Sequence, residues 1–147
     1  MAKLSDQERA ERTAAVMWEN DLASQSSGMQ IDLIGPGFCT TSMTVATQHL
    51  NGHGICHGGY IFMLADSAFA FACNSYNQLV VAQNNSINFV SPGRPSEVLI
   101  AKAKEISRSG RNGIYDVSVT GEGGRVIAEF RGCSRTIKGQ HFEEIEG

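Results

Sequence analysis

One stretch of the chain is apolar on every side of a predicted helix. Residues 58 to 73 form about four helical turns, and Asp66 is the single acidic residue among them. A helix that is apolar all round is typically buried. An ionised carboxylate in such a helix needs a hydrogen-bonding or charged partner, or has a functional role. The helix opens with Gly58 and Gly59, which leave its first backbone N–H groups accessible to an anion. A polar loop with one asparagine and two histidines precedes them, so the stretch is a candidate functional site.

The rest of the chain is expected to enclose this helix. A capping-box pattern that starts at Ser5 predicts an N-terminal helix from about residue 6 to 23. Elsewhere the apolar residues alternate with a period of two, which predicts strands at 29–34, 38–46, 80–90, 97–107, 114–120 and 125–137. Short turns between the later strands imply antiparallel pairing. The predicted class is α+β: a strongly curved antiparallel sheet wraps the long central helix, or a second subunit covers it.

Composition then limits the class of protein. The chain has 147 residues, of which 41% are hydrophobic and 18% charged, and this suits one globular domain. A net charge of −3 argues against a nucleic-acid partner, and the longest apolar run is short for a membrane span. The N-terminal residues lack the apolar segment of a signal peptide, and the four cysteines contain no C-x-x-C pair. We expect a cytoplasmic protein with free thiols and no membrane partner.

The loop and the helix together carry the motif N-G-x-G-x-x-H-G-G-x-x-F-x-L-A-D-x-A, from Asn51 to Ala68. With S-I-N-F-V-S-P at residues 86–92, it resembles the hotdog-fold acyl-CoA thioesterases, in particular the phenylacetate-pathway (PaaI-type) branch. The resemblance implies a hotdog fold and hydrolysis of aromatic acyl-CoA thioesters, of the phenylacetyl-CoA or hydroxyphenylacetyl-CoA type, to free acid and CoA. It implies no metal and no cofactor, since coenzyme A belongs to the substrate. It also implies self-association as a dimer or as a dimer of dimers, which is a homotetramer.

The predicted elements and the extent of the resemblance divide the chain into three parts. Residues 1–27 are expected to be an N-terminal helical extension, and residues 28–138 the hotdog thioesterase domain. Residues 139–147 are expected to be an acidic, disordered tail, because chain ends commonly fray.

Thioester hydrolysis needs a donor for the developing oxyanion and a group that attacks or activates water. In line with the family, the Gly59 N–H is the expected oxyanion donor, and Asp66 is the expected nucleophile or general base. Asn51 can orient the attacking water or the Asp66 carboxylate, and His57 can bond the thioester or help the thiolate leave. The structural alternatives are a satisfied buried acid at Asp66, a turn residue at Asn51 and a helix cap at His57.

The spacing of two of these groups has a geometric consequence. Gly59 and Asp66 are seven residues apart, so on one helix they share a face but lie roughly 10 Å apart along the axis. One carbonyl carbon cannot be close to both. The offset therefore favours sites shared across a dimer, with Asp66 from one chain and Gly59 from the other.

Substrate-binding residues are expected at the helix entrance, on the helix, on the following strand and in the turns: Gly58, Phe62, Asn85, Arg94, Arg108 and Arg111. Phe62 and Asn85, with Leu64 and Phe69, are the expected lining of the acyl pocket. The three arginines lie in predicted turns and, as a cluster, could hold the phosphates of coenzyme A. Taken singly, each arginine is more typical of a solvated surface charge.

Three alternatives compete with the thioesterase. His49, His53 and His57 recur every four residues, but the glycines between them disfavour a helix, so no metal site is expected. A hotdog dehydratase of 3-hydroxyacyl thioesters would use a histidine and an acid. The L-A-D motif and the position of the histidine beside H-G-G favour the thioesterase instead. A non-catalytic acyl-CoA-binding module is disfavoured because Asn51, His57 and Asp66 are all present.

Overall fold

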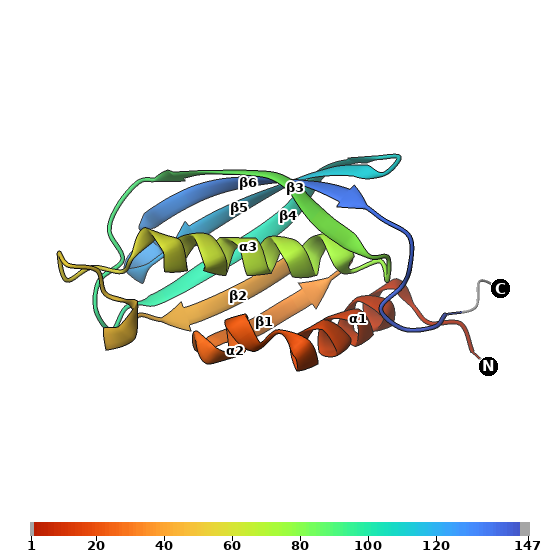
Figure 1. The fold of residues 1–147 in the computed structure, drawn as a ribbon, viewed down its shortest axis with the longest axis horizontal. Helices are drawn as coiled ribbons and strands as arrows, with labels where there is room; N and C mark the ends of the chain where they lie inside the picture. Colours follow the sequence, from red (N-terminus) through yellow and green to blue (C-terminus); the bar gives the residue numbers. More distant parts are fainter. Residues whose placement is uncertain (1, 145–147) are drawn as a thin grey trace.

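The computed structural model describes residues 2–144, and Figure 1 shows a curled sheet with a long helix lying against it. The helices are α1 (Asp6–Asn20), α2 (Leu22–Ser26) and α3 (Gly58–Asn74), with 3-10 turns at Thr47–His49 and Glu122–Gly124. The strands are β1 (Met29–Gly35), β2 (Phe38–Thr44), β3 (Val80–Phe89), β4 (Val98–Ser109), β5 (Asn112–Thr120) and β6 (Val126–Thr136). Each predicted strand is present, with ends that move by up to two residues.

The N-terminal helix differs from its prediction. It begins as expected, because the Ser5 hydroxyl accepts from the Glu8 N–H and the Glu8 side chain bonds back to the Ser5 N–H. It ends at Asn20, since Asp21 leaves the helical conformation and caps α2 by accepting from the Ser24 N–H at 3.0 Å. The predicted single helix over 6–23 is therefore wrong, and two helices meet at Asp21.

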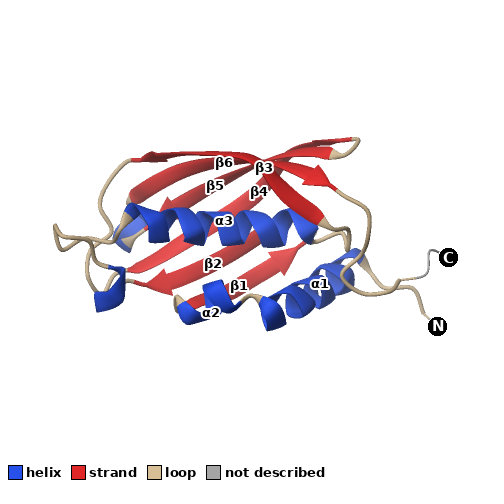
Figure 2. Cartoon of the chain, viewed as in Figure 1, coloured by secondary structure: helices blue, strands red, loops and turns tan. Residues whose placement is uncertain are grey.

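The strand order in the sheet is β1-β2-β4-β5-β6-β3, and all neighbouring strands are antiparallel. The sheet curls so that α3 contacts every strand, and α1 packs beside β1 (Figure 2). This confirms the predicted class, a strongly curved antiparallel sheet wrapped around a long central helix. None of the helices within residues 2–144 combines the length and the apolar character needed to cross a membrane.

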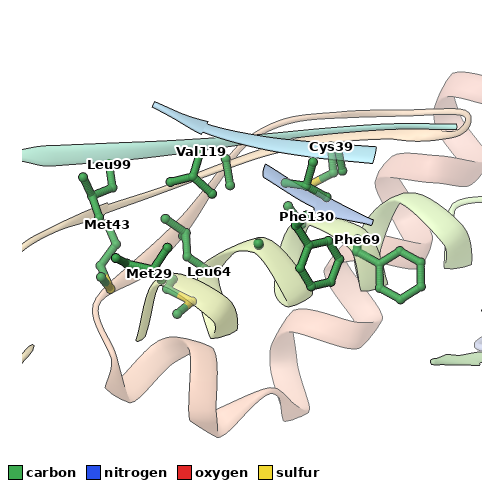
Figure 3. Packing of buried hydrophobic residues seen from close by; sticks show 14 of the residues in the cluster. Met29, Cys39, Met43, Leu64, Phe69, Leu99, Val119 and Phe130 are labelled. Atoms are coloured by element: carbon green, nitrogen blue, oxygen red, sulfur yellow. The ribbon is translucent and has the colours of Figure 1, made fainter. Parts of the chain in front are cut away.

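The core lies between the concave face of the sheet and α3 (Figure 3). Leu64 and Phe69 on α3 are almost fully buried among apolar side chains from the strands. Gly132 on β6 is required for this packing, because a Cβ there would lie 2.7 Å from the ring of Phe69. Phe69 also packs edge-on to Tyr115, with ring centroids 5.7 Å apart.

One side of α3 is not covered within the chain. Gly59 is exposed, while Phe62, Met63 and Asp66 are only partly buried, and their spacing of three or four residues places them on one helix face. The sheet therefore encloses the helix only in part. The uncovered side contains the acid that stands out in the sequence.

The edge of the sheet at β3 is also open. Val81 and Phe89 on this strand are 46% and 55% exposed, and Val90 just beyond it is 60% exposed. An edge strand with exposed apolar side chains presents unpaired backbone groups and an apolar surface to a partner. This strand edge and the uncovered side of α3 are thus both open within the described residues.

The end of the chain is packed where disorder is predicted. Arg9 on α1 forms an ion pair with Glu144 at 2.9 Å, and the Arg12 guanidinium lies 4.4 Å from the centroid of the Phe142 ring. The His141 ring bonds Asn74 at the end of α3 at 2.7 Å. The prediction of a disordered tail is therefore wrong for residues 139–144, because the α1 arginines and the α3 terminus bind it. Residues 145–147 lie outside the described residues.

A buried ion pair holds the loop between β3 and β4. Glu97 is 2% exposed and accepts from the Arg125 guanidinium at 2.8 Å and from the backbone N–H groups of Arg94 and Glu122. Burial alone raises the pKa of Glu97, but the Arg125 bond and the two backbone bonds outweigh it and lower this pKa to about 2.

We expect Glu97→Gln to lower the free energy of unfolding by about 3 kcal/mol at neutral pH, because it leaves the Arg125 charge without its counterion. A carboxylate with a lowered pKa stabilises the fold above its unfolded value of 4.5, and this stabilisation disappears as the pH falls toward about 2. Urea unfolding at several pH values should show that acid-dependent loss in the parent and not in the variant. Glu122→Gln, at an exposed position, is the control, and equal stability of the two variants would contradict the assignment.

Candidate active site

Asp66 lies in the middle of α3 on the uncovered side of the helix. Its Oδ1 accepts a hydrogen bond of 2.8 Å from the Asn85 side-chain Nδ2 on β3. Burial raises the pKa of Asp66 above its ordinary value, the Asn85 bond opposes this rise, and the nearby Asp21 charge adds to it. The acid is thus held in one orientation and is more basic than an exposed aspartate.

A β-bulge directs Asn85 toward the helix. The β3–β6 register shifts between Ala82 and Asn84, where β3 carries one extra residue. Val80 before the bulge and Ile87 after it both pack against the core. In an unbroken strand an even-numbered and an odd-numbered residue would face opposite sides. Side chains alternate along a strand, so the bulge reverses which residues face inward. Asn85 shares the inward side with Ile87 for this reason.

The other end of the candidate site is the N-terminus of α3. His57 is the N-cap, and its Nδ1 accepts from the Gly59 N–H at 2.8 Å, so the neutral ring is protonated on Nε2. A Cβ on Gly59 would lie 3.0 Å from that Nδ1, and a Cβ on Gly58 would lie 3.0 Å from Phe89. Both glycines thus make room for a neighbouring ring. Within the chain, the expected oxyanion donor is bonded to the exposed side chain of His57.

Asn51 stabilises its own loop. Its Oδ1 accepts from the His53 N–H at 2.9 Å and from the Ile55 N–H at 3.4 Å, which is the turn role considered for it. These bonds form within one chain and place Asn51 on the loop that leads to the α3 N-terminus. Cys56 in the same loop is buried, which raises its pKa to about 11, so this thiol is protonated at neutral pH and is not a nucleophile.

The predicted acyl-pocket residues divide into two groups. Phe62 is partly buried on the same side of α3 as Asp66 and packs edge-on against Phe130, with ring centroids 5.4 Å apart. Leu64 and Phe69 are 0% and 1% exposed and belong to the core, so the expectation that they line a pocket is wrong. Their side of α3 faces the sheet.

The three arginines predicted to bind phosphate do not form a cluster within the chain. Arg94 precedes β4, whereas Arg108 is near the end of this strand and Arg111 lies in the turn after it. About ten residues of extended strand separate the two ends, which is roughly 33 Å at the usual rise. Arg108 instead stacks over the Tyr76 ring, 3.6 Å from its centroid. Arg94 is exposed and lies at the same end of the molecule as the α3 N-terminus, because the Cys56 N–H donates to the Gly93 carbonyl.

The histidine spacing in the loop has a structural explanation. His49 is buried, its Nδ1 accepts from the Ala46 N–H at 2.8 Å, and its Nε2 lies 2.9 Å from the Ser27 carbonyl oxygen. Both ring nitrogens are therefore engaged with the backbone. Across residues 2–144, no group of three or more His, Cys, Asp or Glu side chains is arranged to hold a metal ion.

One polar contact beside the site is missing from the sequence-based prediction. The Ser24 hydroxyl donates to the Asp21 carboxylate at 2.7 Å and lies 2.8 Å from the Ser67 hydroxyl. It links the N-terminal helices to the residue next to Asp66. The D-x-x-S pattern of a helix cap is the signal that could have located Asp21 and Ser24.

Fold and site together define a hotdog protein with an acid on its central helix, and comparison with known proteins shows the family. The model of the thioesterase superfamily matches residues 53–128, so the chain belongs to that superfamily. Acyl-coenzyme A thioesterase PaaI of Escherichia coli strain K12 is 40% identical over 131 residues, which are 89% of this chain and 94% of that protein.

Solved structures agree with this. The E. coli PaaI protein from the phenylacetic acid degradation operon has a TM-score of 0.91 and 39% sequence identity, over 92% of this chain and 99% of that one. A hypothetical thioesterase protein of Streptococcus pneumoniae TIGR4, solved with coenzyme A, has a TM-score of 0.78 and 25% identity, over 84% of this chain and 98% of that one.

Proposed function

We propose that the protein is an acyl-CoA thioesterase that hydrolyses aromatic acyl-CoA thioesters, of the phenylacetyl-CoA or hydroxyphenylacetyl-CoA type, to the free acid and CoA. The observation that carries the proposal is Asp66, a partly buried acid that Asn85 orients on the uncovered side of α3. The similarity to acyl-coenzyme A thioesterase PaaI supports the choice of acyl-CoA and of an aromatic acyl group. The related thioesterase solved with coenzyme A supports recognition of the same carrier.

The reaction assigns one role to the N-terminus of the helix and another to its middle. The thioester oxygen would take the place of the His57 Nδ1 as acceptor of the Gly59 N–H, where the helix dipole also favours negative charge. Asp66, as nucleophile or general base, would promote attack on the carbonyl carbon. The displaced His57 ring would then be free to donate to the departing sulfur, while Asn51 keeps the loop in shape.

The site would be completed by a second copy of the chain. Gly59 and Asp66 lie seven residues apart on α3, which is roughly 10 Å along the axis and too far for one carbonyl group. Two α3 helices packed antiparallel through their uncovered sides would bring Gly59 of one chain to Asp66 of the other. The open β3 edge, with Val81 and Phe89 exposed, supports a dimer in which this edge is covered, and a dimer of dimers is the proposed assembly.

A thiol-release assay over a panel of acyl-CoA substrates tests the proposal. Phenylacetyl-CoA and hydroxyphenylacetyl-CoA should have kcat/KM values at least about tenfold above those of acetyl-CoA and short aliphatic acyl-CoAs, because Phe62 offers an aromatic contact on the exposed side of α3. Phe62→Ala should reduce this preference, while Leu22→Ala, at an exposed position on α2, should not. Equal rates on all substrates would contradict the aromatic preference, and no release from any of them would contradict the proposed function.

A further inference from the structure

The N-terminal helices run along one flank of α3 and border its uncovered side. Three contacts join them to α3: Trp18 with Phe71, Ser24 with Ser67, and Ser27 with Met63. The α3 members of these contacts are spaced by four residues, so they form one stripe along the helix. Asp66 directly precedes Ser67 and lies next to this stripe. The N-terminal helices are therefore close neighbours of the acid.

Asp21 fixes the junction of the two N-terminal helices. Its carboxylate accepts from the Ser24 N–H at 3.0 Å and from the Ser24 hydroxyl at 2.7 Å. Because this hydroxyl donates to Asp21, its oxygen must accept the 2.8 Å hydrogen bond from the Ser67 hydroxyl. Both serines are buried, so this chain of bonds is shielded from solvent. The Asp21 carboxylate is thus held in a fixed position relative to the helix that carries Asp66.

Two acids from distant parts of the sequence are thereby brought near each other. Burial raises the pKa of Asp66, the Asn85 bond lowers it, and the Asp21 charge raises it. Both acids are partly buried, so salt and water screen their interaction less than between two surface charges. The arrangement places a like charge close enough to make Asp66 harder to ionise.

We propose that Asp21 is a positioning residue of the active site, which is held at the α1–α2 junction and acts on Asp66 by its negative charge. This inference rests on the proposed thioesterase activity. A more basic Asp66 is a better proton acceptor and a better nucleophile, so both of its possible roles benefit. The inference also gives a function to residues 6–26, which lie outside the residues 53–128 that the thioesterase superfamily model matches.

The other groups around Asp66 within residues 2–144 supply no comparable charge. On β3 the neighbour is the amide of Asn85, and β1, β2, β4 and β6 contribute apolar side chains to the core around α3. Burial raises the pKa of the Cys73 thiol to about 12 and also raises the pKa of Tyr115 on β5, so both are uncharged at neutral pH. In the proposed dimer the His57 ring of the second copy would also lie near Asp66, and it is the same in every variant compared below.

Asp21→Asn removes the charge and keeps a side chain that caps α2 well. The acid limb of the pH dependence of kcat/KM should move to lower pH, because the Asp66 pKa loses the rise due to Asp21. At neutral pH kcat should fall by about two- to fivefold and KM should change by less than about twofold, since a weaker base remains and the acyl-CoA contacts do not change. Asp21→Ser, another neutral helix cap, should behave alike and serves if the asparagine variant does not fold.

The matched control is Glu19→Gln, which removes an equal charge at an exposed position on α1. Solvent screens that charge, so this variant should keep the parental kcat and acid limb. An acid limb that stays at the parental pH in both Asp21 variants, as it does in Glu19→Gln, would overturn the inference.

Ser24→Ala separates the charge from the tether. It breaks the bond to Ser67 but leaves Asp21, which still caps α2 through the backbone N–H of residue 24. The melting temperature should fall by about 2–4 °C, because the buried Ser67 hydroxyl loses its partner, while the acid limb keeps its parental position. An acid limb that moves as far as in Asp21→Asn would mean that loosening of the junction is responsible, and would overturn the role of the charge.

A direct titration of Asp66 needs no turnover. In protein labelled with ¹³C at the aspartate carboxyl carbons, the NMR signal that disappears in Asp66→Asn identifies this residue. Its titration midpoint should lie at lower pH in Asp21→Asn than in the parent and in Glu19→Gln. Equal midpoints in all three would overturn the inference, whatever the activity of the protein. A shifted midpoint in a protein that releases no thiol from any acyl-CoA would support the effect of Asp21 on Asp66 and overturn the proposed function.

Discussion

Asp66→Asn is expected to lower kcat/KM for phenylacetyl-CoA by about 10³-fold or more, measured by thiol release. The variant keeps the shape of the side chain but removes its ability to accept a proton or to attack, and either contribution is typically worth 10²-fold to 10⁴-fold. Asp66→Ala should have a similar effect. Ser67→Ala is the matched control, because Ser67 is the next residue on α3 and bonds Ser24 rather than Asp66.

The stability of the same variant distinguishes a functional acid from a structural one. Burial raises the pKa of Asp66 above its unfolded value, so its protonated form favours the fold and this contribution is lost as the pH rises through the raised pKa. At neutral pH the ionised acid therefore costs stability, and Asp66→Asn should raise the melting temperature while activity falls. A lower melting temperature with retained turnover would mean that Asp66 serves the fold alone.

Gly59→Pro is expected to lower kcat by roughly 10²-fold to 10³-fold, because it removes the proposed oxyanion donor. The fold should tolerate the change. Gly59 is the second residue of α3, and its N–H bonds only the His57 side chain, so no bond within the helix is lost. The proline Cβ would lie 3.0 Å from the His57 Nδ1, so the exposed His57 ring has to turn away. The residue before a proline is disfavoured in the helical conformation, in part because its Cβ clashes with the proline ring. Here that residue is Gly58, which has no Cβ.

Mixing the two inactive chains tests the shared site. Hetero-dimers of Asp66→Ala and Gly59→Pro chains contain one intact site, with Asp66 from one chain and Gly59 from the other. Random reassortment after unfolding and refolding makes about half of the dimers mixed, so about a quarter of the parental activity should return. Each variant refolded alone is the control. Mixed samples with no activity above these controls would place both groups of each site in the same chain.

The parts of the site that the sequence predicts well consist of residues that are close together in the sequence. Gly59, Asp66 and the cap at His57 lie within ten residues, and a helical repeat alone relates them in space. The pairing of Asp66 with Asn85 depends on a bulge in a strand whose residues do not reveal it. Asn85 was predicted only as a pocket residue, and its contact with the acid was missed for this reason.

Apart from the local break between α1 and α2 at Asp21, the incorrect predictions concern contacts between distant segments. Arg94, Arg108 and Arg111 look like a cluster in the sequence, but the length of β4 separates them. The acidic C-terminal residues look solvated, yet Arg9 binds Glu144 across the fold. Leu64 and Phe69 share the apolar helix with Phe62, and only the position of the sheet shows which side of α3 faces inward.

The bulge in β3 has a consequence for evolution and for comparison among relatives. Suppose that one residue is gained or lost near Gln83. Side chains before this point that faced inward would then face outward, and the reverse, while the part of the strand that holds Asn85 keeps its orientation. Aligned columns in this strand can therefore pair residues that point in opposite directions. Equivalent functional groups in relatives are better identified by the face of the strand than by their position in an alignment, and a shift of register is a short evolutionary route to a different partner for the acid.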